Sequence, residues 1–310
     1  MVDLRKWSTR VDAGDTGFWE LDSSLSVRMV YGLDENGRYS FGYFSEKEPQ
    51  TQTISKAIQT VTRQRATDGQ WTQVFILNDP SLKGPFTSFC DHMAREIASA
   101  SSVDFARRSV VDTIAKWRRL FSKGFGVLDI TSLRGLFAEL YVGFELSNRP
   151  WSNDKAAGAW TGPYETPHDF DFGELSLEVK SRALGKNVIR VNGEEQLLGE
   201  KLGLIVVDVS HTQSPEIGHE TLPGLIERIK QSLAPNSIDA LDWGLLELGF
   251  NIAEEEYHNI YFRATETNSY AVFGDFPRIT SKDLPKGITH VSYELQIDSI
   301  SDYKVEKFVW

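Results

Sequence analysis

Hydrophobic and polar residues alternate from Pro167 to Ser181, a pattern that predicts two short strands joined by a tight turn. One face of this segment carries only apolar side chains: Phe170, Phe172, Leu175, Leu177 and Val179. The other face carries Asp169, Asp171, Ser176, Glu178 and Lys180. The alternation breaks at Gly173-Glu174, and glycine suits the first central position of a type II′ turn because that position needs a positive φ. We therefore predict a β-hairpin with one apolar and one polar face.

The position of the turn fixes which residues of this hairpin face each other. Counting back from the turn pairs Phe172 with Leu175, Asp171 with Ser176, Phe170 with Leu177, and Asp169 with Glu178. Directly opposed side chains have Cβ atoms about 4.5–5.5 Å apart, so the last pair would place two carboxylates side by side. Their repulsion requires a positive charge nearby, which either Lys180 on the same face or a divalent cation could supply.

The segments before the hairpin read as strands followed by helices. A strand-like region spans residues 18–77 and contains the hairpin signal Asp34-Glu35-Asn36-Gly37. Helices are predicted at 87–100, from Ser102 to about 123, and from Ser132 to about 146. One face of the second helix carries Arg108, Lys116 and Arg119, which form either a solvated surface or a strip of nucleic-acid contacts.

The segments around and after the hairpin predict a mixed sheet. A short strand is expected within 157–162, a strand at 187–191, a helix at 194–201 and a buried strand at 204–209. Helices are expected at 223–233 and 238–248, and strands near 258–263, 270–274 and 290–297. The order of elements between 130 and 235 favours a mixed sheet flanked by helices.

Composition narrows the class of protein. The 310 residues are 40% hydrophobic and 25% charged, as in ordinary globular proteins, and the chain is long enough for two domains. A single cysteine, Cys90, rules out an internal disulfide and a cysteine zinc cage. No apolar run approaches the ~20 residues of a membrane helix, and the first residues lack a signal-peptide pattern, so we expect a cytoplasmic protein without membrane association. The net charge of −11 disfavours non-specific coating of DNA but is compatible with a local basic groove.

The polar face of the hairpin fits metal-assisted hydrolysis. Mg²⁺ takes one or two carboxylates together with water and phosphate oxygens, so Asp169 and Glu178 could hold it with the Val179 carbonyl. Lys180 could orient or help deprotonate a bound water, which suits phosphodiester hydrolysis. A glycosidase pair of carboxylates is the competing use, but it has no need of the lysine. On the preceding helix, Glu139 lies beside an apolar stripe, where it either reaches solvent at the edge or has a positive partner.

Asp169 followed by Glu178-Val179-Lys180 resembles the PD-(D/E)XK nuclease superfamily, although His168 separates Pro167 from the aspartate. The resemblance implies an α/β (mixed α+β) fold with a restriction-endonuclease-like αβββαβ core and mixed central sheet. It implies Mg²⁺, with Mn²⁺ able to substitute, bound by Asp169, Glu178, Val179 and Glu139. It also implies a catalytic role for these acids, for Lys180, and for Gln196, which could equally be an exposed helix residue. The chain would divide into an N-terminal β-rich region (1–80), a helical connector (81–128) and the nuclease-like domain with a C-terminal α/β extension (129–310).

The stretch Trp160-Thr161-Gly162-Pro163, together with the hairpin motif, resembles a branch of PD-(D/E)XK motif proteins associated with restriction or phage defence. This implies a metal-dependent endonuclease that acts on double-stranded DNA, as a homodimer if both strands are cut, and with other subunits of a defence system. Arg182, Lys186 and Arg190 are further candidates for DNA contacts. Two alternatives stay open: a non-catalytic scaffold that keeps the nuclease fold, and a repair or recombination nuclease.

Overall fold

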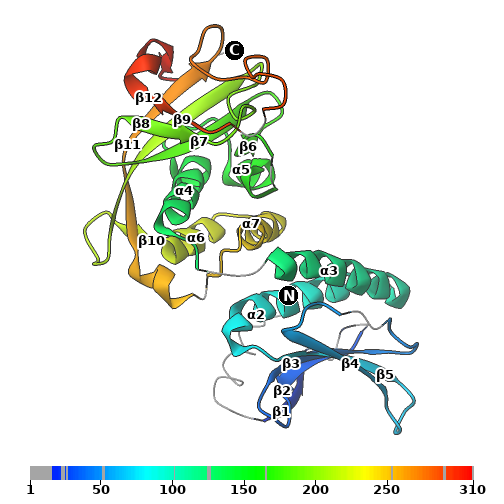
Figure 1. The fold of residues 1–310 in the computed structure, drawn as a ribbon. Coiled ribbons are helices and arrows are strands. Elements are labelled where there is room, and N and C mark those ends of the chain that lie inside the picture. The colour runs from blue at the N-terminus through cyan, green and yellow to red at the C-terminus, as the bar shows by residue number, and fades with distance from the viewer. Residues whose placement is uncertain are drawn as a thin grey trace. The chain divides into compact units, whose positions relative to one another are not determined.

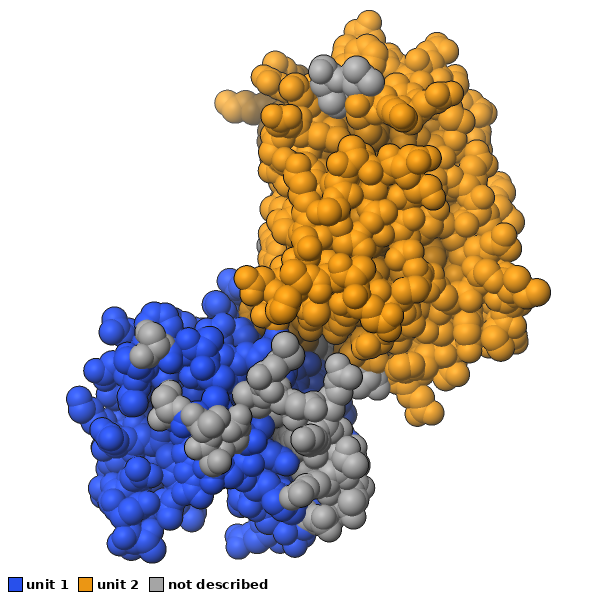
Figure 2. All heavy atoms as spheres, turned by 180° about the vertical axis from the view of Figure 1, so that it is seen from behind, with its two compact units in different colours: residues 1–126 blue, residues 127–310 orange. Residues whose placement is uncertain are grey.

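The chain folds into two compact units, residues 1–126 and 127–310 (Figure 2). The computed structural model describes residues 16–21, 25, 27–50, 53–100, 102–123, 127–164, 166–252, 254–288 and 291–308. The helical segment expected at 81–128 belongs, up to residue 126, to the first unit. Each unit has its own sheet and is described separately below.

The first unit is a five-stranded antiparallel sheet with helices on one face (Figure 1). In the order β1-β2-β3-β5-β4, the sheet comprises β1 (Gly17–Glu20), β2 (Met29–Leu33), β3 (Tyr39–Ser45), β5 (Trp71–Leu77) and β4 (Ile58–Gln64). The short η1 (Pro80–Leu82) leads into α2 (Lys83–Ser99), which is followed by α3 (Val103–Lys123). Phe75 of the sheet meets Phe89 of α2 edge to face, with ring centroids 5.2 Å apart, and Phe89 in turn meets Trp117 of α3 at 5.7 Å. The hairpin predicted at Asp34–Gly37 is confirmed between β2 and β3.

The second unit is built on a six-stranded mixed sheet. Its strands are β6 (Phe170–Asp171), β7 (Ser176–Ala183), β9 (Leu202–Thr212), β11 (Tyr261–Val272), β10 (Glu220–Thr221) and β13 (Lys304–Val305). The neighbours β7 and β9 run parallel, whereas the other pairings are antiparallel, which confirms the mixed sheet expected from the sequence. A separate two-stranded sheet joins β8 (Val188–Val191) to β12 (Tyr293–Gln296).

The second unit also contains helices and helical turns. They are α4 (Ile130–Leu140) with its π-helical continuation η2 (Tyr141–Glu145), α5 (Asn153–Ala159), η3 (Gly162–Tyr164), α6 (Leu222–Lys230), α7 (Pro235–Glu247), η4 (Glu255–Asn259) and η5 (Ile297–Tyr303). Among the described residues, none of these or the earlier helices has the length and apolar character needed to cross a bilayer.

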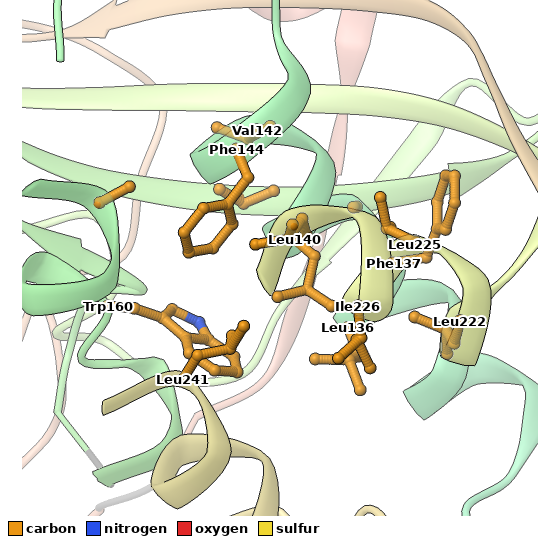
Figure 3. Close-up of a cluster of buried hydrophobic side chains, with 14 of the residues drawn as sticks. Leu136, Phe137, Leu140, Val142, Phe144, Trp160, Leu222, Leu225, Ile226 and Leu241 are labelled. Atoms are coloured by element: carbon orange, nitrogen blue, oxygen red, sulfur yellow. The ribbon is translucent and has the colours of Figure 1, made fainter. Parts of the chain in front are cut away.

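Strand β9 lies between two hydrophobic clusters. Ile205, Val207 and Val209 join the cluster formed with α4, α6 and α7, part of which is shown in Figure 3. Leu204 and Val206 point the other way and join the cluster formed with β8 and β12. Burial on both faces explains why this strand is an almost unbroken apolar run and does not alternate.

Several sequence predictions of secondary structure were wrong. Residues 157–162 do not form a strand, because Ser152 caps α5 by accepting the N–H of Lys155 at 3.2 Å and the alanines that follow favour a helix. Residues 194–201 form turns and no helix, and the two strands expected near 258–263 and 270–274 are one continuous strand, β11. The cap of α4 is Asp129, which accepts the N–H of the predicted cap Ser132 at 2.7 Å.

Candidate active site

The predicted hairpin is present with the predicted turn, and its register is as predicted between Phe170 and Leu177, whereas the predicted pair of Asp169 and Glu178 lies outside the ladder. Gly173 has a φ of 85°, and the N–H of Phe172 donates to the carbonyl of Leu175 at 2.9 Å across the turn. Phe170 pairs with Leu177 and Asp171 with Ser176. The side chains of Phe170, Leu177 and Val179 are buried in the cluster around α4. The polar residues of β7 therefore point to the opposite face, because side chains alternate along a strand.

Asp169 lies where β6 separates from β7 and is held from both sides. Its Oδ2 accepts the N–H of Val179 at 2.7 Å, and its own N–H donates to the carbonyl of Leu177 at 3.1 Å. Its carbonyl accepts the N–H groups of Thr161 and Gly162 at 2.8 and 3.0 Å. The N–H and C=O of one strand residue point to the same side, so the Val179 carbonyl also faces Asp169. These bonds fix the carboxylate beside the middle of β7.

Glu178 and Lys180 form an ion pair on the polar face of β7. Nζ of Lys180 lies 2.6 Å from Oε1 of Glu178 and donates to Oε1 of Gln196 at 2.9 Å. Gln196 lies on a turn, where the same oxygen also accepts the N–H of Asn192 at 2.8 Å. The side chain of Glu178 is 1% exposed, and apart from the Lys180 ammonium against Oε1 its oxygens have no hydrogen-bond partner among the described residues. The lysine is thus well held, whereas the carboxylate keeps unused acceptors.

Glu139 of α4 approaches Asp169 across a glycine. Its Oε2 accepts the indole N–H of Trp160 at 2.9 Å. A Cβ added at Gly162 would lie 2.9 Å from Oδ1 of Asp169 and 3.1 Å from Oε2 of Glu139, so both carboxylates converge on the bare backbone of this residue. Sequence reasoning assigned no role to Trp160 or Gly162. Both lie in the stretch 160–163 that carried the family resemblance, which was the available signal.

Burial and mutual repulsion favour the protonated forms of Glu139, Asp169 and Glu178. Burial, together with the charge of Asp169, raises the pKa of Glu178 to about 8, although Lys180 acts in the opposite direction. Burial and then the charge of Asp169 raise the pKa of Glu139 well above its usual range. Burial also raises the pKa of Asp169, against the lowering effects of Lys180 and the Val179 N–H. A cation beside the carboxylates would favour their ionised forms.

The donor set fits a hard divalent cation with few protein ligands. In the part of the chain that the structure describes, no three or more His, Cys, Asp or Glu side chains form a ready cluster of metal ligands. Mg²⁺ needs no such cluster, because one or two carboxylates completed by water and substrate oxygens are enough. The buried carboxylate of Glu178, which beside Lys180 has no other partner among the described residues, is what such an ion would satisfy. Glu139, bonded to Trp160, lies behind Asp169.

The other residues singled out in the sequence fall in different places. Arg182 makes a two-point ion pair with Asp208, at 2.6 and 2.7 Å, which occupies the guanidinium that was expected to contact DNA. Lys186 and Arg190 are exposed in the second unit, next to and on β8. Arg108, Lys116 and Arg119 are exposed on α3 of the first unit.

Comparison with known proteins assigns the family. Residues 6–298 match the family described as "Putative PD-(D/E)XK family member" (DUF4420), so the match extends through both units. No curated protein and no solved structure matches the chain. With the hairpin acids, the adjoining lysine and the mixed sheet all in place, the chain belongs to this PD-(D/E)XK family, whose membership suggests a nuclease.

Proposed function

We propose that this protein is a metal-dependent DNA endonuclease that hydrolyses phosphodiester bonds in a restriction or phage-defence system. The observation that carries the proposal is the convergence of Asp169, Glu178 and Lys180 on one buried spot, with Gln196 fixing the lysine. Family membership supports nuclease chemistry. The proposal extends this chemistry to double-stranded DNA as the substrate and to a role in defence.

The residues of the site would have different roles, according to their charge and position. Asp169 and Glu178, with the Val179 carbonyl, would hold Mg²⁺ or Mn²⁺, and Glu139 would support Asp169 from behind. When bound, the ion would polarise the phosphate and lower the pKa of a coordinated water. Lys180 would orient the attacking water, because its ammonium is held by Gln196 and lies beside the carboxylate that faces the ion. The hydrogen bond from Trp160 limits the movement of the Glu139 carboxylate.

Cleavage of plasmid and linear duplex DNA by the full chain, with Mg²⁺ or Mn²⁺, tests the proposal. Asp169→Ala and Lys180→Ala should each abolish cleavage. Asp171→Ala is the matched control, because this acid is exposed on the same hairpin and its side chain accepts the N–H of Gly173 at the turn. Unchanged cleavage by Asp169→Ala would refute the assignment.

The same samples distinguish the alternative functions. Calorimetry with Mn²⁺ should show binding by the wild type that Asp169→Ala weakens. If the wild type neither binds metal nor cleaves duplex or single-stranded DNA, the proposed enzymatic function is wrong and a scaffold role is favoured. Preference for single-stranded or branched DNA would replace the restriction role with a repair role.

A dimer is part of the proposal, because one such site cuts one strand. Sedimentation of the protein with duplex DNA should therefore show two copies on one duplex.

A further inference from the structure

The sheet of the first unit has a hollow on the face opposite α2 and α3. The hollow has a volume of about 310 Å³. Its floor includes Val30, Gly42 and Val74, which lie side by side on β2, β3 and β5. Gly42 has no side chain between the two valines, and a Cβ there would come within 3.1 Å of Val74. The missing side chain in the middle of the row deepens the hollow.

Aromatic rings and arginines form the walls. Phe18 of β1 is 48% exposed, so its ring is open to a ligand in the hollow. The guanidinium carbons of Arg28 and Arg65 lie 4.6 and 5.1 Å from the centroid of the Phe44 ring. We call this site, made of Phe18, Arg28, Phe44 and Arg65 over the valine floor, the aromatic groove.

The groove favours an anion with a flat apolar part. Its ionised lining side chains are Arg28, Arg65 and Glu20, which leaves an excess of one positive charge on a protein whose net charge is −11. Arg28 pairs through Nε with Glu20 at 3.2 Å, and Arg65 pairs with Asp68 at 3.6 Å and donates to Thr67 at 3.3 Å. A guanidinium has five N–H donors, so these contacts leave donors available on each arginine.

We propose that the aromatic groove binds one unpaired nucleotide of a DNA strand, which extends the nuclease function proposed above and depends on it. The base would lie against Phe18 and the planar guanidinium groups, whose outer faces stack on bases as readily as on rings. The strand's phosphates would accept the remaining N–H groups of Arg28 and Arg65. The volume sits at the lower end of small-ligand sites, about 300 Å³, which suits one nucleotide and not a longer stacked run.

The groove lies in the first unit, so its binding can be measured apart from cleavage. A single-stranded DNA oligomer with one 2-aminopurine is titrated with the full chain in EDTA, where stacking quenches the fluorescence of the probe. Phe18→Ala and Arg65→Ala should each weaken binding about tenfold and reduce the quenching, as expected for the loss of one stacked base. Arg65→Lys should weaken binding nearly as much, because it keeps the charge but loses the plane.

Arg63→Ala is the matched control, since Arg63 is an exposed arginine of β4, two residues before Arg65, that does not line the groove. Equal weakening by Arg63→Ala and Arg65→Ala would overturn the proposal, because it would show general charge attraction. Equal or tighter binding of a deoxynucleoside monophosphate would also overturn it, by assigning the groove to a free nucleotide. Circular dichroism of each variant verifies its fold, and Phe18, being half exposed, can be truncated at little cost.

The experiments distinguish a wrong assignment of the groove from a wrong assignment of the nuclease site. If Asp169→Ala abolishes cleavage while Phe18→Ala and both Arg65 variants bind the probe like the wild type, the groove is refuted and the nuclease stands. If no metal-dependent cleavage exists but the groove variants lose the probe, the protein binds DNA without cutting it.

Discussion

Replacing Gly162 with alanine tests whether the backbone of residues 160–162 sets the spacing of the acidic site. The added Cβ would lie 2.9 Å from Oδ1 and 3.3 Å from Cα of Asp169, and 3.1 Å from Oε2 of Glu139. Asp169 cannot simply turn away, because its other oxygen is bonded to Val179 and its carbonyl to Thr161 and Gly162. The substitution therefore pushes on both carboxylates at once.

The size of the effect follows from these contacts. The Oδ1 atom must retreat by about 0.5 Å to reach an ordinary contact of 3.4 Å, which is the tolerance a functional site usually has. Overpacking of this kind costs about 1–3 kcal/mol of stability. Displacing a ligand or its support costs about 10- to 100-fold in metal affinity, and we expect a loss in that range for Gly162→Ala.

Calorimetry with Mn²⁺ and thermal unfolding measure both quantities. Gly158→Ala is the matched control, because Gly158 is exposed on α5 and a Cβ there meets nothing within 4 Å. It should bind metal like the wild type and gain about 0.5–1 kcal/mol of stability from helix propensity. Wild-type metal affinity and stability in Gly162→Ala would show that the carboxylates are not held against this glycine.

Two further predictions concern charge. Glu178 has a pKa raised to about 8 in the folded protein, so the native state binds its proton more tightly than the unfolded chain does. Without metal, stability should therefore fall as the pH rises from about 4.5 towards 8, by up to ~1.4 kcal/mol per pH unit, as thermal unfolding would show. Glu178→Gln should reduce the dependence of stability on pH, and Mg²⁺ should restore stability at high pH. An unchanged pH dependence in the variant would show that Glu178 is not its source. Arg182→Met should cost about 3–5 kcal/mol in urea unfolding, because it leaves Asp208, 6% exposed, without its partner, and Arg182→Met/Asp208→Leu should recover most of that loss. A cost below 1 kcal/mol would be too small for a buried pair.

Local patterns predicted the elements whose residues satisfy one another nearby. The hairpin of β6 and β7 was predicted with its turn and with the pairing of Phe170 and Asp171, because alternation and Gly173 act over a few residues. The same method failed at 157–162 and 194–201. At 157–162, the residue that caps the helix is Ser152, which lies outside that segment. At 194–201, the side chain of Gln196 bonds to Asn192 and Lys180, and no helical hydrogen-bond ladder forms.

The site shows the same division. Asp169, Glu178 and Lys180 could be found from the sequence because they lie on one face of a single hairpin. The bond from Trp160 to Glu139, the place of Gly162 against two carboxylates and the pairing of Arg182 with Asp208 could not. Each joins residues from different elements, whose distance depends on how helices and strands pack.

The sequence by itself therefore determined the hairpin, the candidate residues Asp169, Glu178 and Lys180, and the resemblance to the PD-(D/E)XK family, since periodicity and motif spacing are properties of contiguous residues. Only the tertiary structure decided how the acids are buried, which partners they have and how far their pKa values rise. Burial and repulsion act through space and depend on the packing of α4, α5 and β7 around the carboxylates. For the same reason, the aromatic groove could not be predicted from the sequence, because it is lined by residues of β1, β2, β3 and β5 that come together only in the folded sheet.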